Sequence, residues 1–213
     1  MAARGKFISL EGGDGAGKST QARTLAQRLR AKGIEVVLTR EPGGSPLAER
    51  LRTALLSEQG RALEPSAQAI LFAAARADHV TSVIAPALQK GDWVVCDRFV
   101  DSTEAYQGSG GASPSMMALL KRVAVGDMEP DVTFLLDLPP KQAIRRAEQR
   151  DALDPFEAEA LAVHRARRNA FLEIAARDKE RCVVVDAKKS PDEVADTIWA
   201  TVTSRLLPAP AAA

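Results

Sequence analysis

The chain alternates between short runs of strand-forming residues and longer segments with helical periodicity, and this alternation restricts the fold more than any other feature. Three of the strand-like runs are almost continuously apolar, as expected for strands that are buried on both faces of a sheet. Strands that alternate with helices form parallel sheets with right-handed crossovers. The sequence therefore predicts an α/β fold in which a five-stranded parallel sheet carries helices on both faces. The runs are 6–11 (KFISLE), 35–40 (EVVLTR), 93–97 (WVVCD), 132–137 (VTFLLD) and 182–186 (CVVVD).

Serine-proline pairs mark several predicted helix starts. Ser190-Pro191-Asp192-Glu193 has the form of a capping box with proline at the first helical position. Ser45-Pro46 and Ser113-Pro114 are weaker versions of the same signal. No linker divides the chain, so we expect a single domain over residues 1–207, followed by a disordered tail at 208–213.

The bulk composition excludes some classes of partner. The chain has 213 residues and a formal net charge of +1, so no overall field favours a nucleic acid polymer or a membrane surface. No apolar stretch is long enough to cross a bilayer. Cys96 and Cys182 lie in apolar strand-like runs, which predicts buried free thiols and a cytoplasmic protein.

A glycine-rich loop follows the first predicted strand. Gly12 to Ser19 matches the pattern G-x-x-x-x-G-K-[ST] in full, and a helical segment at 21–31 comes next. Backbone N–H groups of such a loop surround phosphate oxygens, and the helix N-terminus adds its partial positive charge. Lys18 is predicted to bridge the terminal phosphates, and Ser19 to bind Mg²⁺. The predicted ATP-binding residues are Gly12, Gly13, Asp14, Gly15, Ala16, Gly17, Lys18, Ser19 and Thr20.

Charged residues end four of the predicted strands, at Glu11, Arg40, Asp97 and Asp137. In a parallel sheet these positions lie at the edge where ligands bind. Asp97 is predicted to hold Mg²⁺ and Arg98 to bind a phosphate, although each alone also fits an ordinary polar strand end. The chain has no N-K-x-D motif of a GTPase and no L-S-G-G-Q signature of a transport ATPase. A kinase for a small molecule fits best.

The sequence resembles the thymidylate kinase family over almost its whole length. The resemblance rests on EGGDGAGKST, TREPGG followed by LAERLR, LFAAARADHV, DRFVDSTEAYQG and the pair Asp186-Ala187, in the order of the family. It implies a phosphate-loop kinase fold with a lid, ATP-dependent phosphorylation of dTMP to dTDP with Mg²⁺ as cofactor, and a homodimer.

The resemblance also implies roles for individual residues. Phe72 would stack on thymine and Arg76 would hydrogen-bond the edge of the base, whereas the hydrophobic pattern alone would place Phe72 in the core and Arg76 at the surface. Tyr106 would lie against the sugar. Asp14 would bind the 3′-hydroxyl. The full set of implied substrate-binding residues is Asp14, Glu41, Arg52, Phe72, Arg76, Arg98, Ser102, Tyr106 and Gln107.

The predicted lid, at about 145–157, departs from the family. Its members usually carry D-R-x-E near the end of this segment, whereas this chain has Asp154-Pro155-Phe156-Glu157. Arg146 and Arg150 are therefore the candidates for closing over the phosphates, with Lys18 and Arg98 completing the catalytic set. A solvated helix face is the alternative for each lid arginine. Two further departures are Gln68, where glutamate is common, and Phe171, where tyrosine is common.

The sequence leaves two other functions open. The chain could phosphorylate another nucleoside monophosphate or a deoxynucleoside. It could also be a nucleotide-binding regulatory module with little turnover, because the lid lacks the expected arginine. No catalytic role is predicted for His79 or His164, since an acceptor phosphate is already ionised and needs no general base.

Overall fold

The computed structural model describes residues 4–148 and 161–207. Its centre is a five-stranded sheet in the order β2-β3-β1-β4-β5, in which every neighbouring pair is parallel. The strands are β1 (Phe7–Glu11), β2 (Val36–Arg40), β3 (Trp93–Asp97), β4 (Val132–Asp137) and β5 (Cys182–Asp186). The predicted fold class and all five strands are confirmed.

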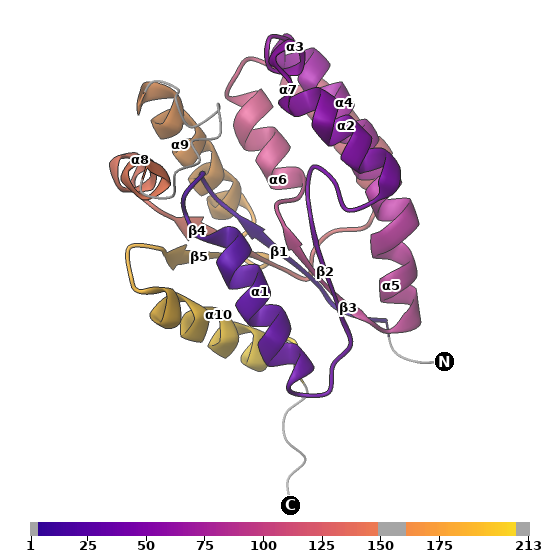
Figure 1. Ribbon diagram of the computed structural model, residues 1–213, viewed down its shortest axis with the longest axis vertical. Coiled ribbons are helices and arrows are strands. Elements are labelled where there is room, and N and C mark those ends of the chain that lie inside the picture. Colours follow the sequence, from indigo (N-terminus) through magenta and orange to yellow (C-terminus); the bar gives the residue numbers. More distant parts are fainter. Residues whose placement is uncertain (1–3, 149–160, 208–213) are drawn as a thin grey trace, which may run out of the picture.

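Helices cover both faces of this sheet (Figure 1). One face packs against α1 (Lys18–Arg30) and α10 (Pro191–Arg205). The opposite face packs against a continuous run of helix formed by α4 (Pro65–His79), η1 (Val80–Ile84) and α5 (Ala85–Lys90), together with α7 (Pro114–Val125) and α9 (Leu161–Arg177). The remaining helical segments are α2 (Pro46–Leu56), α3 (Glu58–Arg61), α6 (Val100–Thr103), η2 (Glu104–Gly108) and α8 (Pro140–Glu148).

The three predicted serine caps are present. Ser190 accepts a hydrogen bond from the backbone of Glu193, whose carboxylate accepts one from the backbone of Ser190, so the capping box is complete. The side chains of Ser45 and Ser113 cap α2 and α7 by accepting from the backbone N–H groups of Ala48 and Met116, without the reciprocal bond of a capping box. Each cap satisfies backbone N–H groups that a helix start leaves without partners.

The buried face of α4 differs from the one that the hydrophobic pattern predicts. Arg76, expected at the surface from that pattern, is only 3% exposed, whereas the apolar Ile70 is 50% exposed. The buried positions of α4 are small alanines and two polar residues: Ala69, Ala73, Ala75, Arg76 and His79.

The glycine loop lies where β1 ends, at the carboxyl edge of the sheet. Gly12 has φ of 131°, and a Cβ there would lie 2.5 Å from the carbonyl oxygen of Leu136. Gly15 has φ of 75°, and a Cβ there would lie 2.6 Å from the carbonyl oxygen of Ala143. Only glycine combines these conformations with such a close approach to β4 and α8. The loop is therefore fixed against the next strand rather than projecting freely.

Candidate active site

A polar groove runs along the glycine loop and the start of α1. Loop residues and five cationic side chains line it, so it can bind a polyanion; the lining residues are Asp14, Gly15, Gly17, Lys18, Ser19, Thr20, Arg23, Arg40, Glu41, Arg52, Asp97 and Arg98. Gly12 and Gly13 lie at the other side of the loop, facing α9. Ala16 is different, because its side chain is buried in the core beneath the loop. It is not among the residues that line the groove.

Lys18 is held inside this groove. Its ammonium group donates to the carbonyl oxygen of Gly13 at 2.7 Å, and the residue is 7% exposed. Burial, reinforced by the positive charge of Arg98, lowers the pKa of Lys18 to about 8. A phosphate group in the groove would supply the negative charge that favours the protonated form.

Ser19 and Asp97 fit the requirements of a magnesium site. The Ser19 hydroxyl donates to Oδ2 of Asp97, while Oδ1 of Asp97 is buried with no hydrogen-bond partner in the described part of the chain. Within residues 4–148 and 161–207, no cluster of three or more His, Cys, Asp or Glu side chains forms a metal site. Mg²⁺ often takes only one or two oxygen ligands from the protein, here the Ser19 hydroxyl and the Asp97 carboxylate, when substrate phosphates and water supply the others.

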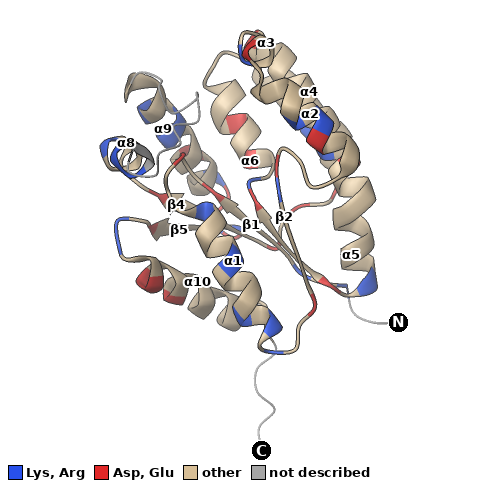
Figure 2. Cartoon of the chain, viewed as in Figure 1, with Lys and Arg blue, Asp and Glu red and all other residues tan. Residues whose placement is uncertain are grey.

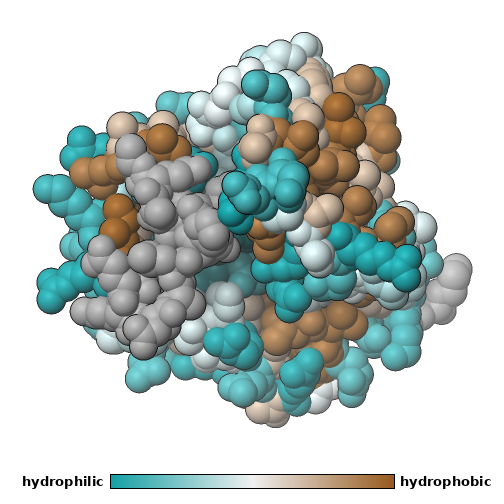
Figure 3. Space-filling model, turned by 45° about the horizontal axis from the view of Figure 1, so that its top comes forward, coloured by the Kyte–Doolittle hydropathy of each residue, from teal (hydrophilic) through white to brown (hydrophobic). Residues whose placement is uncertain are grey.

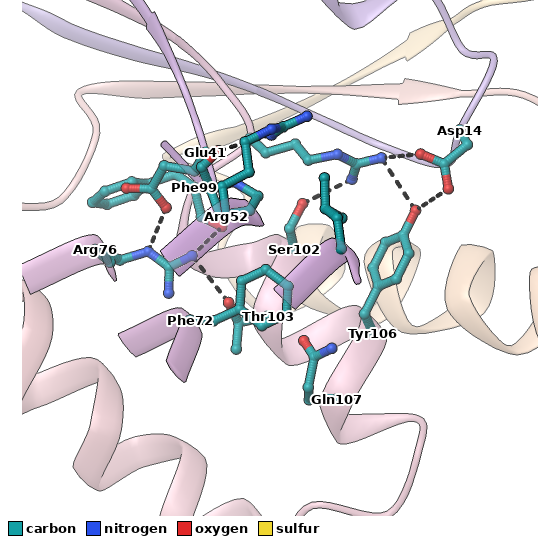
Figure 4. A pocket seen from close by; sticks show the side chains of 13 residues that line it. Asp14, Glu41, Arg52, Phe72, Arg76, Phe99, Ser102, Thr103, Tyr106 and Gln107 are labelled. Atoms are coloured by element: carbon teal, nitrogen blue, oxygen red, sulfur yellow. Dashed lines mark hydrogen bonds and ion pairs between the residues drawn. The ribbon is translucent and has the colours of Figure 1, made fainter. Parts of the chain in front are cut away.

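A second cleft, with about 670 Å³ of empty space, adjoins the groove (Figure 4). It shares Asp14, Glu41, Arg52 and Arg98 with the groove, so a ligand in one would meet a ligand in the other at these residues. All the predicted substrate-binding residues line it. The lining residues are Asp14, Glu41, Pro42, Arg52, Leu56, Phe72, Arg76, Arg98, Phe99, Ser102, Thr103, Tyr106 and Gln107.

At one end of the cleft Arg76 is fixed by a buried network. Its Nε donates to Oε2 of Glu41 at 2.6 Å, and its Nη2 donates to Thr103 and to the carbonyl oxygen of Phe99. His79 shares Glu41 through a 3.0 Å contact from Nδ1 to Oε1. Nη1 of Arg76 makes no hydrogen bond with the other residues drawn in Figure 4. One donor of a rigidly held guanidinium is thus available to the cleft.

At the other end Arg98, Asp14 and Tyr106 form a compact cluster. Arg98 donates to Oδ1 of Asp14, and the Tyr106 hydroxyl donates to Oδ2 at 2.8 Å. Burial alone would raise the pKa of Asp14, but Arg98 and Lys18 hold it well below its usual range. Burial raises the pKa of Tyr106, which keeps the phenol protonated as a donor. The cluster joins the end of β3 to the glycine loop.

Phe72 lies between these two ends, and Gln107 lies on the Tyr106 side of the cleft (Figure 4). Phe72 is partly exposed and points into the cleft, so the pattern-based placement in the core is wrong. The side chain of Gln107 donates to Oε1 of Gln68 at 3.1 Å, while Nε2 of Gln68 donates to carbonyl oxygens of Gly60, Arg61 and Leu63. An amide can donate and accept at once, which explains how Gln68 connects the segment around α3 to the cleft.

The lid candidates are only partly described. Arg150 lies outside the described residues. Arg146 donates through Nη1 to the carbonyl oxygen of Ala187 at 2.9 Å, so its guanidinium lies beside the loop between β5 and α10. Figure 2 shows basic residues along α8 and α9 beside the glycine loop. Asp137, another charged strand end, pairs with Arg168 of α9.

Arg167 and Glu11 also belong to the site, although neither is among the site residues predicted from the sequence. Arg167 is buried, with its guanidinium carbon 4.3 Å from the centre of the Tyr106 ring, and Arg98 lies 5.1 Å from the same ring. Arg167 lies in the basic run 164–168 (HRARR), and only the helical phase of α9 shows which of its arginines turns inward. Glu11 is a predicted strand end, but its hydrogen bonds to the backbone after β3 join segments far apart in the sequence.

Comparison with known proteins places this arrangement in a family. The family model for thymidylate kinase matches residues 10–198. The chain belongs to the thymidylate kinase family. A thymidylate kinase of Bradyrhizobium diazoefficiens is 51% identical over 212 residues, covering 98% of this chain and 93% of that protein. A thymidylate kinase of Rhodopseudomonas palustris is 52% identical over 209 residues, covering 96% and 91%.

A solved structure agrees with this membership of the thymidylate kinase family. The crystal structure of thymidylate kinase from Ehrlichia chaffeensis matches with a TM-score of 0.77 and 32% sequence identity, covering 93% of this chain and 99% of that one. The resemblance found in the sequence is therefore confirmed. No helix in the two described ranges is long and apolar enough to cross a membrane.

The buried network behind Arg76 leads to a stability prediction. Glu41→Gln would leave the buried Arg76 guanidinium without its counter-charge, and we expect a loss of about 3–5 kcal/mol in the free energy of unfolding, measured by urea denaturation. Asp196→Asn, which breaks the exposed pair with Arg28, is the matched control and should cost no more than about 1 kcal/mol. Equal losses in the two variants would contradict this account.

Proposed function

We propose that this chain transfers the γ-phosphoryl group of ATP to dTMP, giving ADP and dTDP. The observation that carries the proposal is the junction of the two binding spaces at Asp14, Glu41, Arg52 and Arg98. A triphosphate in the groove and a monophosphate in the cleft would meet there end to end, as an in-line transfer requires. The comparisons support this reading and favour neither of the alternatives raised by the sequence.

On the donor side, the glycine loop and Lys18 would hold the phosphates of ATP. Ser19 and Asp97 would hold Mg²⁺, which would neutralise charge on the phosphate oxygens. Helix α1 begins directly after Gly17 of the glycine loop, so its N-terminus adds partial positive charge to the phosphate site. No acidic residue in its first turn offsets this charge. These features favour a polyanion over any neutral ligand.

On the acceptor side, Phe72 would stack on the thymine ring, a contact worth about 1–3 kcal/mol per base. Stacking does not distinguish bases, so the free donor of Arg76 would select a carbonyl group such as O4 of thymine. Arg52, Arg98 and Ser102 would bind the monophosphate. Tyr106 would lie against the sugar, with Asp14 near the 3′-hydroxyl and Gln107 along the cleft wall.

During transfer the two anionic substrates must approach each other, so positive charge between them lowers the barrier. Lys18 and Arg98 provide part of this charge at the junction, and Arg52 borders both binding spaces. We propose Arg150 and Arg146 as further cations, contributed by the lid at about 145–157. The acceptor phosphate attacks through an ionised oxygen, so no side chain has to remove a proton.

We further propose that the kinase is a homodimer formed through the α2, α4 and α7 side. Figure 3 shows apolar surface gathered over α2 and α4. On the same three helices, the large apolar side chains of Leu47, Ile70, Leu119 and Val123 are 49%, 50%, 50% and 73% exposed. Exposed large apolar side chains on helices that pack against one another favour self-association. We also propose that the protein is located in a reducing compartment, the cytoplasm, because Cys96 and Cys182 are buried free thiols.

Replacing Phe72 tests the acceptor assignment. Phe72→Ala should raise KM for dTMP about tenfold or more, because a stacking contact is lost, and leave KM for ATP nearly unchanged. Steady-state kinetics with coupled ADP detection measures both. Equal increases would identify Phe72 as a packing residue, and faster turnover of UMP, dCMP or thymidine than of dTMP by the unmodified enzyme would refute the proposed substrate.

Replacing Arg150 tests the lid assignment. Arg150→Ala should lower kcat by a factor on the order of 10³, the lower end for an arginine that stabilises phosphoryl transfer, while dTMP affinity stays nearly level. Arg145→Ala, on the exposed side of α8, is the matched control and should retain its turnover. Unchanged turnover in Arg150→Ala would reject Arg150 as the transfer arginine.

Replacing Leu119 tests the dimer. Leu119→Asp places a charge in the apolar surface and should convert the dimer to a monomer in size-exclusion chromatography with light scattering. Val184→Asp changes a residue of similar exposure, 49%, on the edge strand β5 and should leave the dimer intact. A monomeric unmodified protein, or a dimer that survives Leu119→Asp, would argue against this interface.

A further inference from the structure

Glu11 lies beneath the floor of the acceptor cleft and makes contacts that no role discussed so far requires. It is the last residue of β1 and is only 1% exposed. Its Oε1 accepts from the backbone N–H of Phe99 at 2.7 Å and from that of Ser102 at 3.3 Å. Its Oε2 lies 2.6 Å from the hydroxyl oxygen of Ser102. Glu11 thus contacts the segment that carries Arg98.

That segment has a strained backbone. Arg98 has φ of 69°, the only positive value of a residue other than glycine in the described part of the chain. Its N–H donates to the carbonyl oxygen of Leu10, and the next N–H, of Phe99, donates to Glu11. The two bonds to the end of β1 bracket Arg98 and hold it in a conformation that residues with a Cβ rarely adopt.

The two oxygens of Glu11 face different kinds of partner. Oε1 faces only N–H groups, so it must accept. Oε2 faces a hydroxyl, which can either donate to it or accept from it. A neutral carboxylic acid matches this arrangement fully, because its carbonyl oxygen takes both N–H bonds and its O–H donates to Ser102.

Ser102 Oγ also accepts from Nη1 of Arg98 at 3.0 Å, and it lines the cleft. A serine hydroxyl has two acceptor sites and one donated hydrogen. If Glu11 donates, both acceptor sites are filled, and the hydrogen of Ser102 is free for a ligand in the cleft. If Glu11 is ionised, that hydrogen turns down to Oε2 and is lost to the ligand.

We propose that Glu11 is a positioning residue for the acceptor phosphate, which in its protonated form directs the Ser102 hydroxyl hydrogen into the cleft. This inference rests on the proposed function, since it names the phosphate of dTMP as the group that receives the hydrogen. An ionised Glu11 would act against binding twice, because it withdraws the Ser102 donor and places a negative charge under the phosphate site.

The surrounding charges favour the protonated form near neutral pH. Burial, and then the adjacent carboxylate of Asp101 on α6, raise the pKa of Glu11 to about 8, although the Ser102 hydroxyl and Arg98 oppose the change. Asp101 is itself paired with Arg181, which precedes β5. The other ionisable groups whose pKa values depend on the charge of Glu11 are Lys18 on α1 and the thiols of Cys96 and Cys182.

The sign of the pH effect follows directly. As pH rises through about 8, Glu11 loses its proton, Ser102 turns away, and affinity for the acceptor phosphate falls. We expect KM for dTMP, measured at saturating MgATP, to rise about tenfold or more between pH 7 and pH 9.5, the size of a lost hydrogen bond to a charged group. The second pKa of a phosphate ester, about 6, lies below this window.

The variant Glu11→Gln mimics the protonated form of Glu11 at every pH. Its amide oxygen can accept both N–H bonds, and its NH₂ can donate to Ser102 at any pH, so KM for dTMP should lose its rise above pH 7. Ser102→Ala should already show a raised KM at pH 7. Glu129→Gln, which alters an exposed glutamate paired with Lys121, is the control and should keep the rise. A rise that persists in Glu11→Gln would overturn the proposal.

A titration of ¹³C-labelled glutamate by NMR provides a readout independent of activity and of any variant's folding. The Glu11 carboxyl signal, assigned by its loss in Glu11→Gln or by sequential methods, should titrate near pH 8. Titration below pH 6 would overturn the inference. Absence of dTMP turnover at every pH would instead defeat the proposed function while leaving the titration of Glu11 unaffected.

Discussion

The ion pair between Arg98 and Asp14 joins the two halves of the active site. Asp14 belongs to the loop after β1 and Arg98 to the turn after β3, and these strands are neighbours in the sheet. Because both strands are parallel, their ends meet at one edge, and a charge from each can pair there without a long loop. The groove and the cleft share both residues, so the pair fixes the distance between the two binding spaces.

Charge balance dominates the construction of this edge. A site for two anions needs an excess of cations, yet before ligands arrive those cations must be stabilised out of water. The protein solves this with internal carboxylates: Glu41 behind Arg76 and Asp14 beside Arg98. Each arginine keeps a fixed orientation because several of its donors are used by the protein.

The sequence predicts the fold well because the fold depends on local signals. Strand runs, serine caps and the glycine loop each act within a few residues, and a parallel sheet follows from their order. The cleft was harder to predict, because its residues come from four separate segments. Phe72 shows the limit: by periodicity it belongs to the core, and only contacts with distant segments decide that it lines a cleft.

Arg167 and Glu11 show a second limit. Arg167 stands among other arginines, and one step along a helix turns a side chain by about 100°, so its inward direction depends on how α9 packs. Glu11 acts through the backbone after β3, which is a contact across 88 residues. Pairings of this kind depend on register between strands, and no pattern within one segment contains that information.

The positive φ of Arg98 places stability and activity in opposition at one position. Glycine would adopt this backbone conformation without strain, but it would remove the guanidinium that reaches Asp14, Tyr106 and Ser102. Among variants selected only for thermal stability, glycine at position 98 would therefore be favoured. Among variants selected for growth that depends on the activity of this kinase, the same replacement would be eliminated.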